Sequence, residues 1–277
     1  MKEKFRKFLF VVFLVIFIIS MIYIITYLYT MKKDEKDLRI LQNVMNTEIE
    51  EEVNNTLQID ENENIVKNNQ EVNTNLAKVE NLKKLQAEYP DIVAWLEIEN
   101  SSINYPVLQG KDNDYYLYKN YKGVYSRNGS IFLDYRYDFS KENQNFFVYG
   151  HNNNDQIMFN ELIKYSEEEY YKSHQNISLI TNQTVEQYEI VAVFKSEIFN
   201  KDVNNVFKYY KYLEFETEEK FDEYINNCKE KSLYKIDKNA EYGDKILTLS
   251  TCEYSKPNGR FVVVATLKQE VENLENK

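Results

Sequence analysis

Three residues in the C-terminal half of the chain have side chains that together could cleave and re-form a peptide bond. They are Cys252, His151 and Arg260. Cys252 ends the apolar run KILTLSTC, and Arg260 opens the next apolar run after the loop EYSKPNG. If these two runs pair as a hairpin, the cysteine and the arginine lie close together beside its turn. His151 follows the run FFVYG, so it also lies at the end of a predicted strand.

The three side-chain types have complementary chemistry. A thiolate is a good nucleophile for a peptide carbonyl, and a nearby histidinium or guanidinium stabilises it. An imidazolium can protonate the leaving amine, and an imidazole can later deprotonate an incoming nucleophile. A guanidinium can donate hydrogen bonds to the tetrahedral oxyanion, and no carboxylate is needed to orient the histidine. Taken singly, each residue also has an ordinary structural interpretation: packing for Cys252, solvation for Arg260, and a turn for the Gly-His pair.

A β-rich domain is predicted around these residues, because the 24 Tyr and 16 Phe favour strands. The apolar and alternating runs predict a strand region beginning at Trp95 and further strands over Ile103–Leu108, Ser130–Asp134, Phe146–Tyr149, Ile177–Thr181, Tyr188–Phe194, Lys245–Thr251 and Phe261–Leu267. The pairs Asn128-Gly129 and Asn258-Gly259 are strong turn signals between strands. The pattern predicts one mainly β domain, a closed or nearly closed mixed barrel.

Helices are predicted at three places in this domain. Leu76–Leu85 fits a short amphipathic helix, and Met158–Tyr165 fits a second. Glu218–Lys231 fits a third, with Thr217 as its N-cap and acidic residues in its first turn. The apolar face of this third helix contains Cys228, which is therefore interpreted as a core residue.

Composition excludes several classes of function. A net charge of −11 argues against binding to nucleic acid, which needs clustered Lys and Arg. Two cysteines, Cys228 and Cys252, cannot form a framework of disulfides. With only His151 and His174 beside them, a zinc site is not expected either. No motif indicates calcium, and no metal or organic cofactor is expected.

The N-terminal region predicts a membrane anchor. Phe8–Met31 contains no charged side chain and is long enough for the roughly 30 Å hydrocarbon layer. Basic residues precede it, so the N-terminus is expected in the cytoplasm. A cleaved signal peptide is the alternative, but it would have a shorter apolar region and a small-residue cleavage site. Residues 1–7 are interpreted as a cytoplasmic tail and residues 8–31 as the anchor.

Residues 32–75 are interpreted as an acidic Asn- and Glu-rich stalk. From Asn43 to Asn75 the acidic residues far outnumber the single Lys67, and low apolar content prevents a packed core. Helical spacing near Leu38 and Met45 allows a weak helix beside the membrane, although a solvated spacer is preferred. Residues 76–277 are assigned to the globular domain.

Several segments resemble the sortase family. TLSTC, with an arginine eight residues after its cysteine that opens RFVVVATL, resembles the active-site segment of sortases. VYGHNNNDQIMF resembles the segment that carries the family's histidine. WLEIENSSINYPVLQGKDNDYYL and GSIFLDYR resemble class B sortases in particular, as does the predicted helix Glu218–Lys231 ahead of the cysteine. The resemblance extends from about Asp91 to Leu267.

The resemblance implies roles for individual residues. Cys252 would be the nucleophile, His151 the acid and base, and Arg260 the stabiliser of the oxyanion or substrate. Further positions implied for the substrate groove are Asn113, Leu117, Tyr149, Ser250 and Glu253. Each of these five could instead pack or face solvent. His174 matches no motif and is interpreted as a surface residue.

The resemblance also implies a function. A membrane-anchored cysteine transpeptidase would cleave a C-terminal sorting motif after Thr and transfer the acyl group to a cell-wall amine. Its partners would be secreted proteins with such a motif, of Asn-Pro-x-Thr or Ser/Pro-Pro-x-Thr type, and a peptidoglycan precursor or cross-bridge. The catalytic domain would be extracellular. Two alternatives stay open, a thiol endopeptidase with water as acceptor and an inactive binding module; a pilin-assembling transpeptidase is a variant of the first interpretation.

Overall fold

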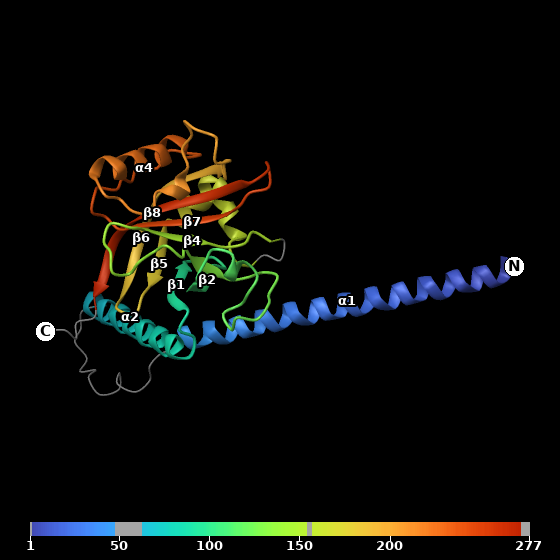
Figure 1. Cartoon of the computed structure of the whole chain (residues 1–277). Helices are drawn as coiled ribbons and strands as arrows, with labels where there is room; N and C mark the ends of the chain where they lie inside the picture. Colours follow the sequence, from blue (N-terminus) through green and yellow to red (C-terminus); the bar gives the residue numbers. More distant parts are fainter. Residues whose placement is uncertain (1, 48–62, 154–156, 273–277) are drawn as a thin grey trace. The chain divides into compact units, whose positions relative to one another are not determined.

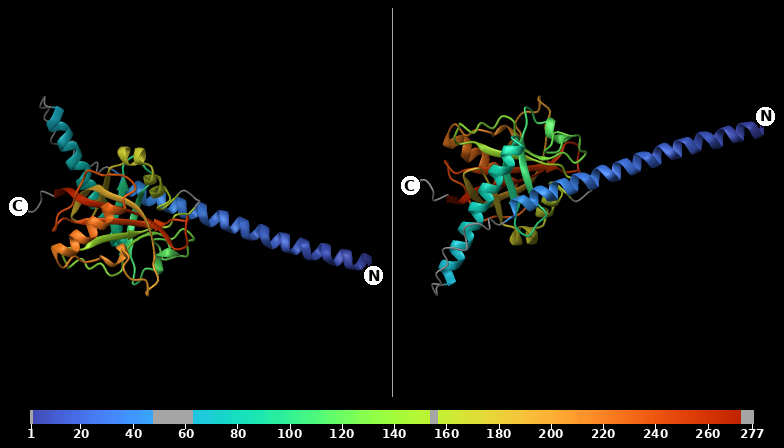
Figure 2. Two further views of the ribbon diagram at one scale, coloured as in Figure 1. Left: turned by 90° about the horizontal axis from the view of Figure 1, so that it is seen from above. Right: turned by 90° about the horizontal axis from the view of Figure 1, so that it is seen from below.

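Eight strands form a closed barrel in the computed structural model, which describes residues 2–47, 63–153 and 157–272 (Figures 1 and 2). Around the barrel the strand order is β1-β2-β3-β4-β7-β8-β6-β5. The strands are β1 Ile92–Ile98, β2 Asn104–Gln109, β3 Ile131–Leu133, β4 Asn145–Tyr149, β5 Asn176–Ile180, β6 Thr184–Glu197, β7 Ile246–Cys252 and β8 Gly259–Glu272. This confirms the predicted barrel and shows that it is closed.

The barrel is mixed, and its strand directions decide which chain segments meet. β4 pairs with β7 in parallel, and β2 pairs with β3 in parallel, while the other neighbours are antiparallel. Because β4 and β7 run in the same direction, their C-terminal ends lie at the same end of the barrel. The first residues of β8 return from β7 at that end too.

Helices cover two sides of the barrel. α2, Glu63–Glu88, packs against β1, β5 and β6, and α4, Glu218–Lys231, packs against β6 (Figure 1). The two further views agree that α2 and α4 lie on different sides of the strands (Figure 2). The shorter helices are η2 Tyr115–Leu117, η3 Glu161–Ser166, α3 Glu168–Ser173 and η4 Tyr209–Lys211.

The bounds of α4 agree with the prediction because the signals that define it are local. The Thr217 hydroxyl accepts a hydrogen bond from the Lys220 backbone N–H over 3.3 Å, as an N-cap does. The buried face packs against strands β6, β7 and β8, and consists of Phe221, Tyr224, Ile225 and Cys228. Cys228 is therefore a core residue, as predicted.

The predicted helix over Met158–Tyr165 is wrong in its first half. Met158 has a φ of 57° and pairs with Asn152 in an isolated bridge. Its backbone N–H donates to the Tyr105 hydroxyl over 3.2 Å, so this tertiary contact replaces a helical hydrogen bond. Only Glu161–Ser166 is helical, as a 3-10 turn, and the helix α3 that follows was not predicted.

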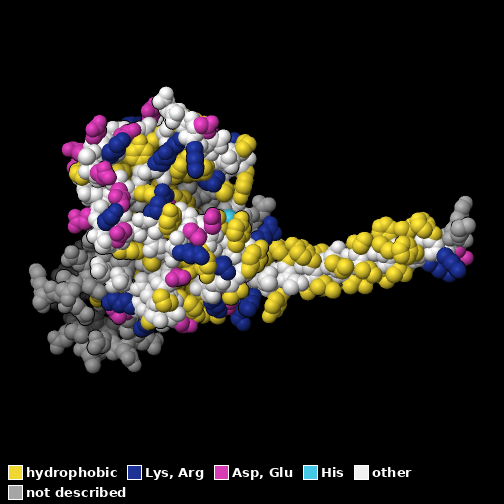
Figure 3. Space-filling model, in the orientation of Figure 1, with side chains coloured by type: hydrophobic (Ala, Val, Ile, Leu, Met, Phe, Trp, Pro, Cys, Tyr) yellow, Lys and Arg dark blue, Asp and Glu magenta, His cyan; other side chains and the backbone are white. Residues whose placement is uncertain are grey.

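The N-terminal part of the chain contains one long helix. α1 runs from Lys2 to Met45 and includes the whole apolar run (Figures 1 and 3). By length and composition it could cross a membrane. The chain divides into two compact units, Met1–Leu41 and Gln42–Lys277. The predicted stalk is helical at both ends, within α1 and α2, and its residues 48–62 lie outside the described residues. Its boundaries stay a prediction.

Candidate active site

Cys252 and Arg260 face each other across the turn between β7 and β8. They are direct partners in the antiparallel pairing of these strands. Side chains of directly paired residues point to the same side of a sheet, with Cβ atoms about 4.5–5.5 Å apart. The turn between them closes with a hydrogen bond from the Glu253 N–H to the Gly259 carbonyl over 3.0 Å. The predicted hairpin is present and places Cys252 and Arg260 side by side. The guanidinium Nη1 donates to the carbonyl of the neighbouring Gly259 over 2.9 Å.

His151 lies two residues beyond the end of β4, alongside the end of β7. Three hydrogen bonds join the two segments there. The Gly150 N–H donates to the Ser250 carbonyl over 3.2 Å, and the Thr251 hydroxyl donates to the Gly150 carbonyl over 2.7 Å. The Asn152 side-chain amide donates to the Cys252 carbonyl over 2.9 Å. Since residues 150 and 152 are both bonded to β7, the histidine between them lies beside Cys252.

The imidazole of His151 is oriented by a backbone carbonyl. Its Nε2 lies 2.7 Å from the carbonyl oxygen of Leu117, in the short helix η2. A carbonyl oxygen can only accept, so Nε2 carries the proton in this hydrogen bond. In the neutral imidazole, Nδ1 then has an unshared electron pair and can accept a proton. The exposed ring of Tyr118 lies beside the imidazole, with 6.0 Å between ring centroids.

Two of the predicted groove residues, Asn113 and Tyr149, converge on one buried carboxylate. The side-chain amide of Asn113 and the hydroxyl of Tyr149 both donate to Oδ2 of Asp134, each over 3.0 Å. Arg136 donates to the same carboxylate from Nε over 2.8 Å and from Nη2 over 2.7 Å. Asp134 is fully buried, so these donors replace its hydration. The carboxylate thereby fixes the orientation of the Asn113 and Tyr149 side chains, one from before Asp134 in the sequence and one from after it.

The pKa of Asp134 reflects two opposing causes. Burial alone would raise it, but the hydrogen bonds from Arg136 and Asn113 outweigh burial and lower it below the usual value. Burial and the adjacent Asp134 raise the pKa of the Tyr149 hydroxyl far above its usual value. Asp134 is therefore ionised and Tyr149 is a neutral donor at physiological pH.

Replacing Asp134 by asparagine is expected to lower the free energy of unfolding by about 2–4 kcal/mol at pH 7, because a neutral amide cannot balance Arg136. The folded-state pKa of Asp134 is lowered, so its contribution is present above the unfolded pKa of about 3.9 and is lost as pH falls below it. Urea unfolding of both proteins at pH 7 and pH 3 would measure this. The difference should shrink at the lower pH.

The matched control for this prediction is Glu142→Gln, which removes an exposed carboxylate a few residues along the chain. It should change the free energy of unfolding by less than about 0.5 kcal/mol. Equal effects of the two substitutions would show that Asp134 contributes only to the overall charge of the protein.

Of the other predicted groove residues, Leu117 contributes its carbonyl to His151, and Ser250 and Glu253 have side-chain partners within the protein. The Ser250 hydroxyl is buried and lies 2.9 Å from the Tyr209 hydroxyl. Glu253 is nearly buried and forms an ion pair with Lys195 over 3.1 Å. Its other oxygen accepts from the Ser255 hydroxyl over 2.5 Å, inside the β7–β8 turn. Both residues therefore support the strand end and the turn that carry Cys252.

Several residues at this end of the barrel were not singled out from the sequence. Asp134 and Arg136 belong to the GSIFLDYR segment, where an acid directly after a buried strand was the available signal. Asn152 follows the candidate histidine, and nothing in its local sequence indicates a bond to Cys252. The hydroxyl of the exposed Tyr254 donates to the Asn152 carbonyl over 2.7 Å, which links the β7–β8 turn to the histidine segment.

Comparisons with known proteins show the family of this chain. The sortase domain family matches residues 96–268, which include all three candidate catalytic residues. Sortase B of Listeria monocytogenes is 38% identical over 188 residues, covering 67% of this chain and 73% of that protein. This chain belongs to the sortase family, in class B. As a sortase it is a cysteine transpeptidase with a role in protein anchoring.

Solved sortase structures confirm the fold. The sortase is similar to a Staphylococcus aureus sortase B–substrate complex, with a TM-score of 0.66 and 28% identity over 86% of this chain and 97% of that chain. It is also similar to a sortase B complexed with triglycine, with a TM-score of 0.67 and 27% identity over 86% of this chain and 98% of that chain.

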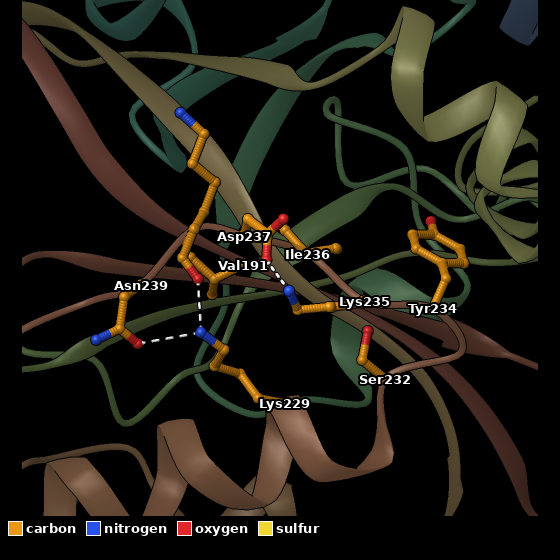
Figure 4. Close-up of a pocket in the computed structure, with 9 residues that line it drawn as sticks. Val191, Lys229, Ser232, Tyr234, Lys235, Ile236, Asp237 and Asn239 are labelled. Carbon is orange, nitrogen blue, oxygen red and sulfur yellow. Dashed lines mark hydrogen bonds and ion pairs between the residues drawn. The ribbon is translucent and has the colours of Figure 1, made fainter.

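A separate pocket lies at the C-terminal end of α4, lined by Val191, Lys229, Ser232 and residues 234–239 (Figure 4). Its lysines have partners within the protein. Lys229 Nζ donates to the Lys238 carbonyl over 2.7 Å, Lys235 pairs with Asp237 over 2.6 Å, and Lys238 pairs with Glu189 over 2.9 Å. Each of these lysines thus has a hydrogen-bond or ion-pair partner, and none of the lining residues belongs to the candidate active site. Within the described residues, no cluster of His, Cys, Asp and Glu could hold a metal ion.

Proposed function

We propose that this sortase cleaves a C-terminal sorting motif after threonine and transfers the new acyl group to a cell-wall amine. The observation that carries the proposal is the pairing of Cys252 with Arg260 beside the segment of His151. These three residues would act as nucleophile, oxyanion stabiliser and acid–base group.

In the acylation step, the Cys252 thiolate attacks the carbonyl carbon of the threonine, and a new S–C bond forms. The carbonyl electron pair moves to the oxygen, where the Arg260 guanidinium stabilises it by hydrogen bonds. When this intermediate collapses, the C–N bond breaks and the imidazolium of His151 gives its Nδ1 proton to the departing amine. The products are a thioester on Cys252 and the released C-terminal peptide.

In the transfer step, an amine replaces the released peptide. Neutral His151 takes a proton from the incoming amine at Nδ1 while the amine attacks the thioester carbonyl. Arg260 again stabilises the oxyanion, and the S–C bond breaks to restore the thiolate. The peptide bond to the acceptor is then complete, and His151 is an imidazolium ready for the next acylation.

Two related structures support the choice of donor and acceptor. One is a sortase B–substrate complex, and the other is sortase B complexed with triglycine. For this chain we therefore propose a sorting-signal peptide as the acyl donor and a peptidyl amine as the acyl acceptor. The other proposed partners are secreted proteins that carry the motif and a peptidoglycan precursor or cross-bridge.

The proposal includes a membrane anchor in α1. Apolar side chains cover the helix along most of its length, with Lys and Arg at its N-terminal end (Figure 3). An excess of basic residues on one flank favours the cytoplasm for that flank. The N-terminus would then be cytoplasmic and the barrel extracellular, where secreted substrates and cell-wall precursors are present.

The test uses the full chain in detergent with a panel of sorting-motif peptides, with and without triglycine, read by intact mass. Cleavage after threonine, an acyl adduct on Cys252 and transfer of the acyl group to triglycine are expected. Hydrolysis that does not respond to triglycine would instead indicate a thiol endopeptidase. Peptide binding without any adduct would indicate an inactive binding module and would contradict the proposal.

A further inference from the structure

Residues 126–130, in the connection between η2 and β3, hold the backbone on both sides of Leu117. The Ser130 N–H donates to the Tyr116 carbonyl over 2.9 Å, and the Ser126 N–H donates to the Tyr118 carbonyl over 3.0 Å. The carbonyl groups on either side of Leu117 therefore have partners in the same segment. This restricts the direction of the carbonyl between them, which is the one that receives the hydrogen bond from His151.

Gly129 lies in this segment in direct contact with the Leu117 peptide group. Its φ is 56°, a left-handed conformation that a side chain disfavours. A Cβ at this position would collide with the Leu117 carbonyl oxygen and lie only 2.8 Å from its carbonyl carbon. It would also lie 2.5 Å from the Tyr116 oxygen. Because the colliding atoms are backbone, an added side chain would have to displace the carbonyl itself.

The turn formed by Asn128 and Gly129 also contacts the segment that carries His151. Asn128, directly before Gly129, is 3% exposed. Its Oδ1 accepts a hydrogen bond from the Asn153 side-chain amide over 3.0 Å. Asn153 follows His151 by two residues. The turn therefore contacts both the acceptor carbonyl and the segment of the donor imidazole.

We propose that Gly129 is a positioning residue for His151 that acts through the Leu117 carbonyl. The absence of a side chain allows this carbonyl to reach Nε2 and hold the neutral imidazole in the tautomer with its proton on Nε2. In that tautomer Nδ1 has an unshared electron pair and can accept a proton from an amine or thiol. In the opposite tautomer Nδ1 already carries a proton and cannot act as a base. The catalytic consequence rests on the proposed role of His151.

The test compares Gly129→Ala with Gly123→Ala in the full chain in detergent. Gly123 also lies between η2 and β3 and also has a positive φ, of 70°. An alanine at either position therefore has a similar conformational strain. A Cβ at Gly123 would come no closer than 3.3 Å, to the hydroxyl of a tyrosine side chain. The comparison therefore isolates the collision with the Leu117 carbonyl.

The decisive readout is the tautomer of His151, from the 15N shifts of its two ring nitrogens, followed with rising pH until they stop changing. The chain has only two histidines, so His174→Gln assigns the signals. Wild type and Gly123→Ala should both show the proton on Nε2. Gly129→Ala should show a mixture of tautomers, with acylation of Cys252 slowed at least about tenfold.

A wild-type His151 with its proton on Nδ1 would overturn the proposal, as would a folded Gly129→Ala variant with an unchanged tautomer. If Gly129→Ala does not fold, Asn128→Ala loosens the same turn without an added side chain. It should also mix the tautomers, and an unchanged tautomer there would likewise overturn the proposal. The shifts are measured without substrate, so a failure of the proposed transpeptidation is distinguishable from a failure of this inference.

Discussion

Replacement of Cys252 by alanine is expected to abolish transpeptidation, with kcat/KM lowered at least about 10³-fold. Alanine has no group that can form the thioester, so neither cleavage nor transfer can proceed through the proposed intermediate. The pairing of residue 252 with Arg260 and the hydrogen bond from the Gly150 N–H to the Ser250 carbonyl do not involve the thiol, so the fold and peptide binding should persist. Peptide cleavage with triglycine, followed by intact mass, measures the loss.

The chain contains its own control for this prediction. Cys228 is a second thiol, fully buried on α4, and burial raises its pKa far above the usual value. Its thiol is therefore protonated and shielded from reagents. Cys228→Ala should retain turnover within about twofold, and iodoacetamide should alkylate only Cys252 in the folded protein. Substantial turnover by Cys252→Ala, or its loss in Cys228→Ala, would contradict the assignment of the nucleophile.

The second large effect is expected for Arg260→Lys, which keeps the positive charge but should lower kcat/KM by about 10²–10³-fold. A guanidinium presents several N–H donors in a fixed plane, whereas an ammonium is a flexible point charge. Arg260 is the direct strand partner of Cys252, which is why we propose that its guanidinium donates to the oxyanion of the acyl intermediate. The loss should be mainly in kcat, because the interaction strengthens in the transition state.

Lys256→Ala is the matched control for this substitution. Lys256 lies in the same β7–β8 turn and forms a half-exposed ion pair with Glu197, so it contributes charge without being the strand partner of Cys252. Its loss should change kcat/KM by less than about threefold. Guanidinium added to Arg260→Ala should restore part of the activity. Near-normal turnover by Arg260→Lys would assign Arg260 to structure rather than to catalysis.

Sequence patterns were sufficient for the elements whose signals are local. The apolar run ending in Cys252, the Asn258-Gly259 turn and the strand opening at Arg260 predict a hairpin, and the hairpin brings these two residues together. The Thr217 cap and the apolar spacing after it predict α4 to the residue. In each case the interactions that define the element join residues close together in the chain.

Patterns failed where a distant group replaced a local interaction. Met158 has helical spacing with the residues after it, yet its N–H bonds to Tyr105 instead of continuing a helix. The groove assignment of Asn113 and Tyr149 stays a prediction, but no local signal indicated that their side chains bond to Asp134. Asp134 lies 21 residues from Asn113 and 15 from Tyr149 in sequence, so only the barrel brings them together.

The sequence by itself determined the residue types for thiol chemistry, the hairpin of Cys252 and Arg260, the barrel class and one candidate membrane helix. These follow from side-chain chemistry and from hydrogen bonding between neighbours in the chain. The tertiary structure decided how His151 is oriented, because its acceptor on Leu117 belongs to a segment 34 residues earlier in the chain. That contact exists because antiparallel pairing of β3 with β4 brings the start of β3 to the end of β4, and Ser130, just before β3, is bonded to the Tyr116 carbonyl next to Leu117.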